Sequence, residues 1–380
     1  MRCVSVSVAA LVFALAPSAW RFAEASALLM ELTKLPLPAA AKRAFLGELD
    51  AQEISLYVAG AQVRGRRYKP RARGGQAPRI LLLHGVHADG IDEPRLTGFA
   101  RALARVGVDV MTPELTALAH YQVRPELAAN ILELAGAWAS AQGTRSVGVM
   151  GISFAGGLAL IAAAAQGGSE PIGYVVSVGA HHDLDRVCEF YAGNDVRGPA
   201  QERPTAQPHP YGARVFLRAE LPRLVGQQDL ALATEVLDSY LHDRPREARR
   251  LLAGLSPAAQ RTMGVLIDPH GSEVLSRWLL AAIERERAQL AAASPRGQLA
   301  GLEVPVLLLH GSDDPVVPSI ETRYLAAELP SGCLRELLVT DLLRHAELSE
   351  RPKLRDVYHL ARFMQRVLHV ARATASANAR

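Results

Sequence analysis

The sequence predicts an α/β protein built on a doubly wound, mostly parallel sheet. The first observation is a set of short apolar runs, which suit strands buried on both faces of such a sheet. These runs lie at residues 79–83, 108–113, 147–150 and 174–179. The second is that helical patterns separate the runs, so that strands alternate with crossover helices. The third is that the alternation stops after residue 182 and resumes at 304, which predicts a helical insertion.

Composition narrows the class of protein. The chain has 380 residues, of which 49% are hydrophobic and 21% charged, so it is globular and long enough for one α/β domain with an insertion. The net charge of +4 is slight and argues against a nucleic-acid partner. Cys3, Cys188 and Cys333 are too far apart for a metal-ligand spacing or a disulfide framework. We expect buried free thiols, with a Cys188–Cys333 bridge as the alternative.

The N-terminus has the features of a secretory signal. Arg2 precedes an apolar run at 4–16, and Ala25-Ser26-Ala27 resembles a cleavage site. The interpretation is a signal peptide over 1–27 or, alternatively, an uncleaved membrane anchor, although the apolar run is short for a full span. The protein is therefore predicted to be exported or membrane-anchored, with membrane association through this segment. If the segment is only an ordinary leader helix, the protein is cytoplasmic.

The rest of the chain divides into three parts. A first part of the α/β core covers residues 28–182, and a second covers 303–380. Between them, residues 183–302 contain proline-rich turns and several helical stretches but no clear buried strand. This region predicts a helical cap over the functional site, and packing of these helices in the outer layer is the alternative.

Two features precede the first buried strand. Residues 53–58 and 61–65 predict a hairpin of edge strands. The basic run from Arg66 to Gly75 then predicts a solvated loop, with contact to anionic lipid as the alternative.

A serine lies at a predicted tight turn between a strand and a helix. The β-branched run 147–150 ends in Gly151, Ser153 follows, and small residues lead into a helix. Gly151 and Ala155 flank the serine at positions where a bulky side chain would collide with the other arm of the turn. This is the G-x-S-x-G pattern of a nucleophile, with alanine in the last position. Small residues around a serine are common in an alanine-rich chain, so the motif needs partners.

Two later stretches supply those partners. A serine nucleophile needs a base to take its proton, and the base must itself be oriented. The apolar run 304–309 ends in an acidic turn with Asp313 and Asp314, and the predicted strand 334–339 is followed by His345. Serine, acid, then histidine is the chain order of α/β-hydrolases.

On these motifs the chain resembles the serine α/β-hydrolases, most closely the esterase and dienelactone-hydrolase-like branch. The resemblance covers about residues 53–182 and 300–372. It rests on three motifs at predicted strand ends, namely His84-Gly85, Gly151-x-Ser153-x-Ala155 and Gly311-x-x-Asp314-x-x-Val317-Pro318. It implies an α/β-hydrolase fold, a doubly wound, mostly parallel sheet with a helical cap insertion.

The resemblance also implies a role for each site residue. Ser153 is the nucleophile, His345 the base and then the acid, and Asp314 the group that orients the histidine. The backbone N–H groups of Phe154 and Val86 form the oxyanion hole. Two such fixed donors would contribute about 3 kcal/mol each to transition-state stabilisation.

Several alternatives stay open at this site. Asp313 is interpreted as a turn residue, because the spacing from Gly311 and Pro318 favours Asp314, and Asp183 is the runner-up acid. The stretch His181-His182-Asp183 follows a strand and would suit a metal, but no further spaced ligands accompany it, so no metal is predicted. We expect His84 and His310 to brace loops through hydrogen bonds.

The predicted function is hydrolysis of a carboxylic ester, or a thioester, through an acyl-serine intermediate. The substrate is a small molecule, and the reaction needs no cofactor. A peptidase or an acyltransferase on the same triad is a second interpretation, and a non-catalytic binding module is a third.

Overall fold

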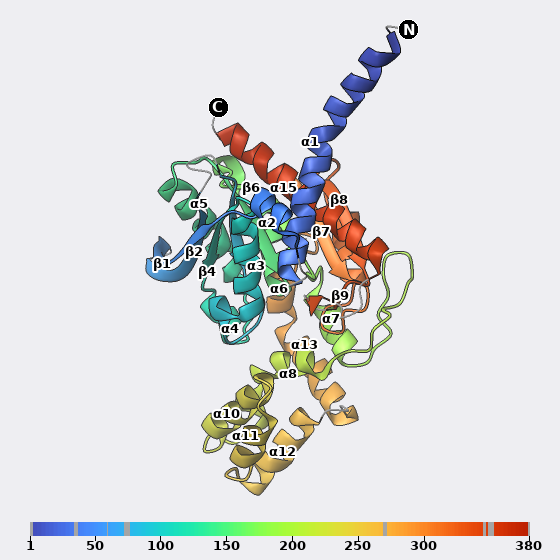
Figure 1. The fold of residues 1–380 in the computed structure, drawn as a ribbon. Coiled ribbons are helices and arrows are strands. Elements are labelled where there is room, and N and C mark those ends of the chain that lie inside the picture. Colours follow the sequence, from blue (N-terminus) through green and yellow to red (C-terminus); the bar gives the residue numbers. More distant parts are fainter. Residues whose placement is uncertain are drawn as a thin grey trace.

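The computed structural model of the protein describes residues 3–33, 37–58, 60–71, 77–268, 272–344, 347–348 and 353–378. Eight strands form one sheet in the order β1-β2-β4-β3-β5-β6-β7-β8, which is parallel except where β2 pairs with β1 and with β4 (Figure 1). The strands are β1 (Leu49–Val58), β2 (Ala61–Pro70), β3 (Arg79–Leu83), β4 (Asp109–Pro113), β5 (Val147–Ile152), β6 (Ile172–Val178), β7 (Val306–Gly311) and β8 (Leu334–Thr340). A separate small hairpin joins β9 (Leu343–Arg344) and β10 (Glu347–Leu348).

Helices cover both faces of the sheet, as a doubly wound fold requires. One face carries α5 (Glu126–Ala141), α6 (Phe154–Ala164) and α14 (Ile320–Glu328), and the other carries α1 (Cys3–Leu32), α3 (Pro94–Arg105) and α15 (Leu354–Asn378). Residues of β3 alternate between the two cores: Leu81 and Leu83 belong to the first, and Ile80 and Leu82 to the second. The continuous apolar run of β3 is therefore explained by burial on both faces. Short helices complete this part: α2 (Ala39–Phe45), η2 (Gly90–Asp92), α4 (Thr116–Ala119) and η3 (Gly167–Ser169).

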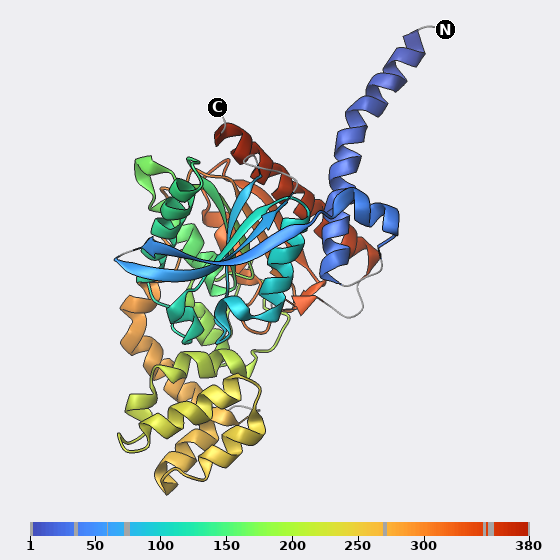
Figure 2. The same cartoon turned by 60° about the vertical axis from the view of Figure 1, so that its left-hand side comes forward.

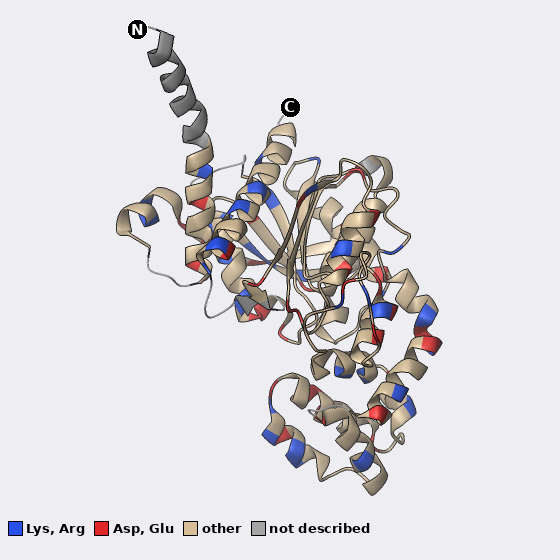
Figure 3. Ribbon diagram, turned by 90° about the vertical axis from the view of Figure 1, so that its right-hand side faces the viewer, with Lys and Arg blue, Asp and Glu red and all other residues tan. Residues whose placement is uncertain are grey.

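Between β6 and β7 the described chain contains helices and loops but no strand. Figures 1 and 2 show that much of this segment forms a lobe to one side of the sheet domain. In Figure 3, basic and acidic residues are interspersed along the helices of this lobe. The helices are α7 (Leu184–Tyr191), α8 (Pro210–Arg218), α9 (Leu221–Leu224), α10 (Leu230–Leu241), α11 (Pro245–Leu252), α12 (Pro257–Ile267) and α13 (Glu273–Ala292). We call these helices the cap, and a position over the functional site stays a prediction.

The prediction of a solvated loop after the hairpin is wrong for residues 66–70, because β2 continues to Pro70. Arg67 forms an ion pair with Asp109 at 2.6 Å, and its guanidinium lies 5.0 Å from the centre of the Trp138 ring. Tyr68 is fully buried. Charged residues enter the sheet here because partners from distant segments neutralise and cover them. Residues 72–76 of the basic run lie outside the described part of the chain.

The second half of α1 packs into the core of the protein. Ala25, Ala27 and Leu28 are buried against the second core, and Glu24 forms a buried ion pair with Arg372 of α15 at 2.6 Å. Within the described residues, no helix is long and apolar enough to cross a membrane. The signal peptide or anchor over 1–27 stays a prediction. Its proposed cleavage site falls inside a packed helix.

Deletion of residues 1–27 is expected to lower the melting temperature by several degrees. The deletion removes buried Ala25 and leaves Arg372, whose side chain is only 24% exposed, without the carboxylate of Glu24. Thermal unfolding followed by circular dichroism measures the effect. A chain that begins at Ser18 is the matched comparator, because it keeps these contacts. Equal melting temperatures for the two chains would contradict the expectation.

The two cysteines with described side chains are free. Cys188 and Cys333 are both buried thiols, so the bridge between them that the sequence left open is absent from the structure. The Sγ of Cys333 donates to Leu302 O at 3.2 Å, and burial raises the pKa of the Cys188 thiol well above its usual range. The expectation of buried free thiols is confirmed for this pair.

Candidate active site

Ser153 lies at the turn between β5 and α6 with an unusual backbone. Its φ and ψ angles are 56° and −133°. A positive φ is uncommon for a residue other than glycine and costs conformational energy, so the surroundings must hold it. The N–H of Ser153 donates to Val178 O at 2.7 Å, and the Ser153 carbonyl accepts from the Gly156 N–H at 2.9 Å. The serine is therefore fixed at the carboxyl edge of the sheet, where open α/β sheets bind ligands.

Two glycines make room for this turn. A Cβ atom on Gly151 would lie 2.5 Å from the Ala155 carbonyl oxygen, closer than atoms can approach. A Cβ atom on Gly85, at the end of the neighbouring β3, would lie 3.2 Å from the Cβ atom of Ser153. The spacing of small residues seen in the sequence thus has a steric cause, and the ends of β3 and β5 touch at Ser153.

Substitution of Gly151 by alanine is expected to displace the serine and destabilise the protein. The clash is with backbone, which cannot move away like a flexible side chain, so the free energy of unfolding should fall by about 1–3 kcal/mol. Urea denaturation measures it. Gly98→Ala in α3 is the matched control, because nothing lies within 4 Å of its added Cβ atom. An equal response from both variants would contradict the steric argument.

The loop after β3 carries the first predicted oxyanion donor, the N–H of Val86. His84 holds this loop: its Nε2 accepts the N–H of Leu115 at 2.9 Å, so in the neutral ring Nδ1 carries the proton and donates to Gly85 O at 2.8 Å. The Gly85 carbonyl and the Val86 N–H belong to one planar peptide, so fixing the first orients the second. The expectation that His84 braces a loop is confirmed.

The second predicted donor is the N–H of Phe154, the first residue of α6. An N–H at this position has no acceptor within its own helix. The positive end of the helix dipole adds a favourable potential for an anion here. These two donors come from neighbouring strand ends, which suits a single small anionic group.

Asp314 lies at the end of β7 and is only 1% exposed. Its Oδ1 accepts the N–H groups of Val316 and Val317 at 2.8 and 2.9 Å. Its Oδ2 faces the end of β6, because a Cβ atom on Gly179 would lie 3.6 Å from it. Since β6 lies between β5 and β7, Ser153 and Asp314 leave strands about 10 Å apart. An imidazole with a hydrogen bond at each end spans such a gap.

The predicted base, His345, lies outside the described residues, so its role stays a prediction. The described chain reaches Arg344 at the end of β9, and β9 contacts β7, the strand that carries Asp314. Asp313, the acid beside Asp314, is exposed. His310 is fully buried and is held by Val317 O and the Thr322 hydroxyl, at 2.8 and 2.5 Å, which confirms it as a loop brace.

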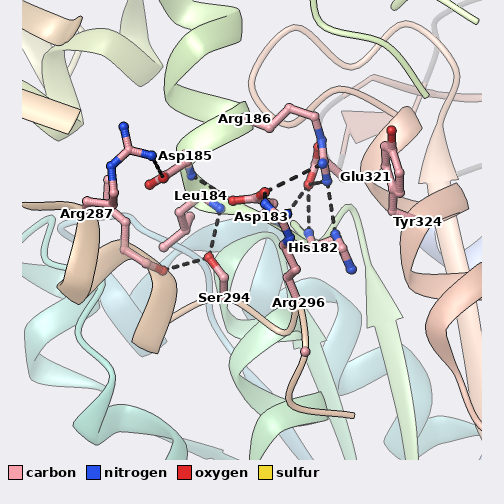
Figure 4. A network of polar contacts seen from close by, with 12 residues as sticks. His182, Asp183, Leu184, Asp185, Arg186, Arg287, Ser294, Arg296, Glu321 and Tyr324 are labelled. Atoms are coloured by element: carbon pink, nitrogen blue, oxygen red, sulfur yellow. Dashed lines mark hydrogen bonds and ion pairs between the residues drawn. The ribbon is translucent and has the colours of Figure 1, made fainter. Parts of the chain in front are cut away.

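Asp183, the runner-up acid, has a set of structural partners. Its carboxylate accepts the N–H of Asp185 at 3.1 Å and pairs with Arg296 at 2.8 Å and Arg186 at 3.6 Å. Figure 4 shows these groups at the base of the cap.

The same network joins the segment that leads from β6 into the cap to the segment that leads from the cap to β7. The buried carboxylate of Glu321 accepts the N–H groups of His182 and Asp183 at 2.9 and 2.8 Å (Figure 4). At the entry to the cap, the N–H of Leu184 donates to the hydroxyl of Ser294, which lies at the exit from the cap, at 2.9 Å. Polar contacts thus join the base of the cap to the core.

The adjacent histidines have separate partners. His181 Nε2 contacts Ala293 O at 2.9 Å, and complete burial lowers the pKa of the ring to about 4. His182 Nε2 pairs with Glu328 at 2.6 Å. No group of three metal-ligating side chains occurs in the described ranges.

A cavity of about 490 Å³ lies elsewhere in the molecule. It is lined in part by Pro305 and Leu334, which stand at the amino ends of β7 and β8, and by Arg335, Arg366 and His369. It is therefore on the opposite edge of the sheet from Ser153 and is not the site that the serine defines.

Two residues at or near the site were not predicted. Glu321 closes the base of the cap, and the hydroxyl of Tyr211 in α8 donates to Val86 O at 2.9 Å. Tyr211 is 125 residues away from Val86 in the chain. No local sequence pattern marks either residue, because each acts through a partner from a distant segment.

A mostly parallel, doubly wound sheet with a serine held on a strained turn between strand and helix defines the α/β-hydrolase fold. The predicted fold class, and the resemblance to α/β-hydrolases at the level of fold, are confirmed. No protein-family model matches the sequence, and no curated protein matches it.

Several solved structures are similar to the chain at low identity. One is 2-hydroxy-6-oxo-6-phenylhexa-2,4-dienoate hydrolase from Rhodococcus, 18% identical over 77% of this chain and 91% of that one, with a TM-score of 0.42. Acylaminoacyl peptidase of Pyrococcus horikoshii is 12% identical over 84% of this chain and 40% of its own, with a TM-score of 0.48. Proline iminopeptidase of Mycobacterium smegmatis is 13% identical over 85% of this chain and 100% of its own, with a TM-score of 0.44.

Proposed function

We propose that the protein is a serine hydrolase that cleaves a carboxylic ester, or a thioester, through an acyl-serine intermediate. The observation that carries the proposal is the geometry of Ser153. It adopts a positive φ at the carboxyl edge of the sheet, directly before α6, and the first N–H of a helix has no acceptor within its own helix. A buried carboxylate at Asp314, two strands away, supports the assignment.

The proposed reaction has two halves. Ser153 Oγ attacks the carbonyl carbon while His345 takes its proton, and the N–H groups of Phe154 and Val86 stabilise the resulting oxyanion. His345 then donates that proton to the departing alcohol or thiol, which leaves an acyl-serine. Water attacks the acyl group in the same manner and releases the acid. Asp314 orients the imidazole and stabilises its charged form.

The acceptor of the acyl group separates this function from its alternatives. An acyltransferase would use the same residues but transfer the acyl group to an alcohol or amine in place of water, and a peptidase would accept an amide. The fold and the triad are common to all three reactions, so measured turnover of each substrate class separates them. A non-catalytic protein with this fold would need neither a strained serine nor a buried acid.

Chemical labelling and turnover test the proposal. The intact protein is treated with a fluorophosphonate, the modified peptide is mapped by mass spectrometry, and turnover of p-nitrophenyl esters from acetate to laurate is measured. We expect one adduct, on Ser153, and release of p-nitrophenol with a preferred chain length. An adduct on another serine would reject Ser153 as nucleophile. A folded protein that neither reacts with the label nor cleaves any ester would favour the non-catalytic interpretation.

A further inference from the structure

Helix α8 of the cap begins over two loops of the candidate site. The N–H of His209, its N-cap residue, donates to the carbonyl oxygen of Pro315 at 2.7 Å, next to Asp314. Two residues later, the hydroxyl of Tyr211 donates to Val86 O at 2.9 Å, in the loop after β3. The first turn of α8 therefore contacts both the loop that carries the acid and the loop that carries the first oxyanion donor.

Side chains hold two successive carbonyl groups of the loop after β3. His84, from the core, donates to Gly85 O at 2.8 Å, and Tyr211, from the cap, donates to Val86 O at 2.9 Å. The N–H of Val86 lies between these two carbonyls in the chain. Its direction depends on the torsion angles at Gly85 and Val86, since the peptide itself is planar. Glycine gives little resistance to rotation, so the two hydrogen bonds must supply it.

We propose that Tyr211 is a positioning residue that fixes the Val86 N–H toward the oxyanion, so that the oxyanion hole is complete only when the cap is seated. The inference rests on the proposed function, because it assigns a role to Val86 in that reaction. Tyr211 does not touch the reacting atoms in this scheme. It acts through the loop, and the first turn of α8 links the position of the cap to the geometry of the donor.

The protonation of Tyr211 and a second contact of α8 with the core are consistent with this role. Burial raises the pKa of the Tyr211 phenol, so the hydroxyl stays protonated and donates at any working pH. At the other end of α8, Arg218 donates to His120 O at 3.3 Å and pairs with Asp238 at 2.6 Å. Because α8 has this separate contact with the core, loss of one hydroxyl at Tyr211 should not detach the cap.

The chain offers a matched control for the hydroxyl of Tyr211. Tyr324 of α14 donates to Arg197 O at 3.0 Å, which is also a hydrogen bond from a tyrosine to a backbone carbonyl, here in the segment between α7 and α8. Its ring packs against Arg186 and His182, and no contact with the loop after β3 is found among the described residues. Each substitution removes one hydrogen bond to a backbone carbonyl and should lower the melting temperature only slightly, while only Tyr211→Phe alters the proposed oxyanion donor.

The experiment compares kcat and KM of the full-length wild type and both variants on the best p-nitrophenyl ester. It also measures inhibition by an alkyl boronic acid, which forms a tetrahedral adduct with the serine. For Tyr211→Phe we expect kcat to fall by about tenfold, the effect of one hydrogen bond, with KM within about twofold. Affinity for the boronic acid should fall by a similar factor. Tyr324→Phe should match the wild type in kcat, in KM and in affinity for the boronic acid.

Each outcome has a definite meaning. Tyr211→Phe with wild-type kcat in an active enzyme would overturn the inference and leave the proposed function intact. A rise in KM with unchanged kcat would also overturn it, because it would make Tyr211 a contact for substrate. A wild type that neither reacts with the fluorophosphonate nor cleaves esters would reject the proposed function itself.

Discussion

Replacement of Ser153 by alanine is expected to abolish labelling by a fluorophosphonate and to lower kcat for p-nitrophenyl esters by about 10⁴-fold or more. The loss follows from the absence of the only oxygen that the proposed mechanism acylates. Residual catalysis over the reaction in water would come from the oxyanion donors alone. Initial rates on the preferred ester, with the melting temperature measured in parallel, check the expectation.

Ser177→Ala is the matched control for that variant. Ser177 is 1% exposed on β6, and its Oγ has no hydrogen-bond partner among the described residues. It lies beside α6, since a Cβ atom on Gly156 would be 2.7 Å from the Oγ. Deleting this second buried hydroxyl near the turn should leave activity unchanged. Retained activity in Ser153→Ala, or an equal loss in Ser177→Ala, would remove Ser153 from the mechanism.

Replacement of Asp314 by asparagine is expected to lower kcat by about 10³- to 10⁴-fold with little change in stability. The Oδ1 atom that accepts the N–H groups of Val316 and Val317 is retained, so the turn after β7 should keep its shape. The negative charge is lost, however, and an amide cannot stabilise the protonated imidazole that forms when the serine is deprotonated. The fall should therefore appear mainly in kcat and not in KM.

Asp313→Asn provides the control, because Asp313 is the exposed neighbour in the same turn. It should keep wild-type kinetics. If Asp314→Asn were as active as Asp313→Asn, the acid would have to come from elsewhere, and Asp183→Asn would become the next variant to measure. The partners of Asp183, two arginines and the N–H of Asp185, favour a structural role for that carboxylate.

The extent of sequence-based prediction differs between elements. Buried strands such as β3 and β5 were predictable because burial on both faces needs an uninterrupted apolar run. The end of β2 was not predictable, because a run of basic residues is typical of a solvated loop. Only the tertiary structure shows that Asp109 and Trp138 lie beside Arg67. The apolar N-terminus was interpreted as a leader, while burial of Ala25 and Ala27 depends on α3 and α15.

By itself, the sequence determined the parts of this protein that follow from local chemistry. Gly151 and Ala155 predict the turn at Ser153 because the steric contact that they avoid lies within a few residues of the chain. The alternation of strands and helices predicts the sheet for a similar reason. The spacing of apolar residues within each strand or helix depends on which side of that one element is buried.

The tertiary structure alone decided which distant groups meet. The hydrogen bond from Tyr211 to Val86 and the contacts of Glu321 at the base of the cap each join segments more than a hundred residues apart. A single hydrogen bond leaves no period or spacing in a sequence. It requires only one donor and one acceptor, which the folding of the whole chain brings together.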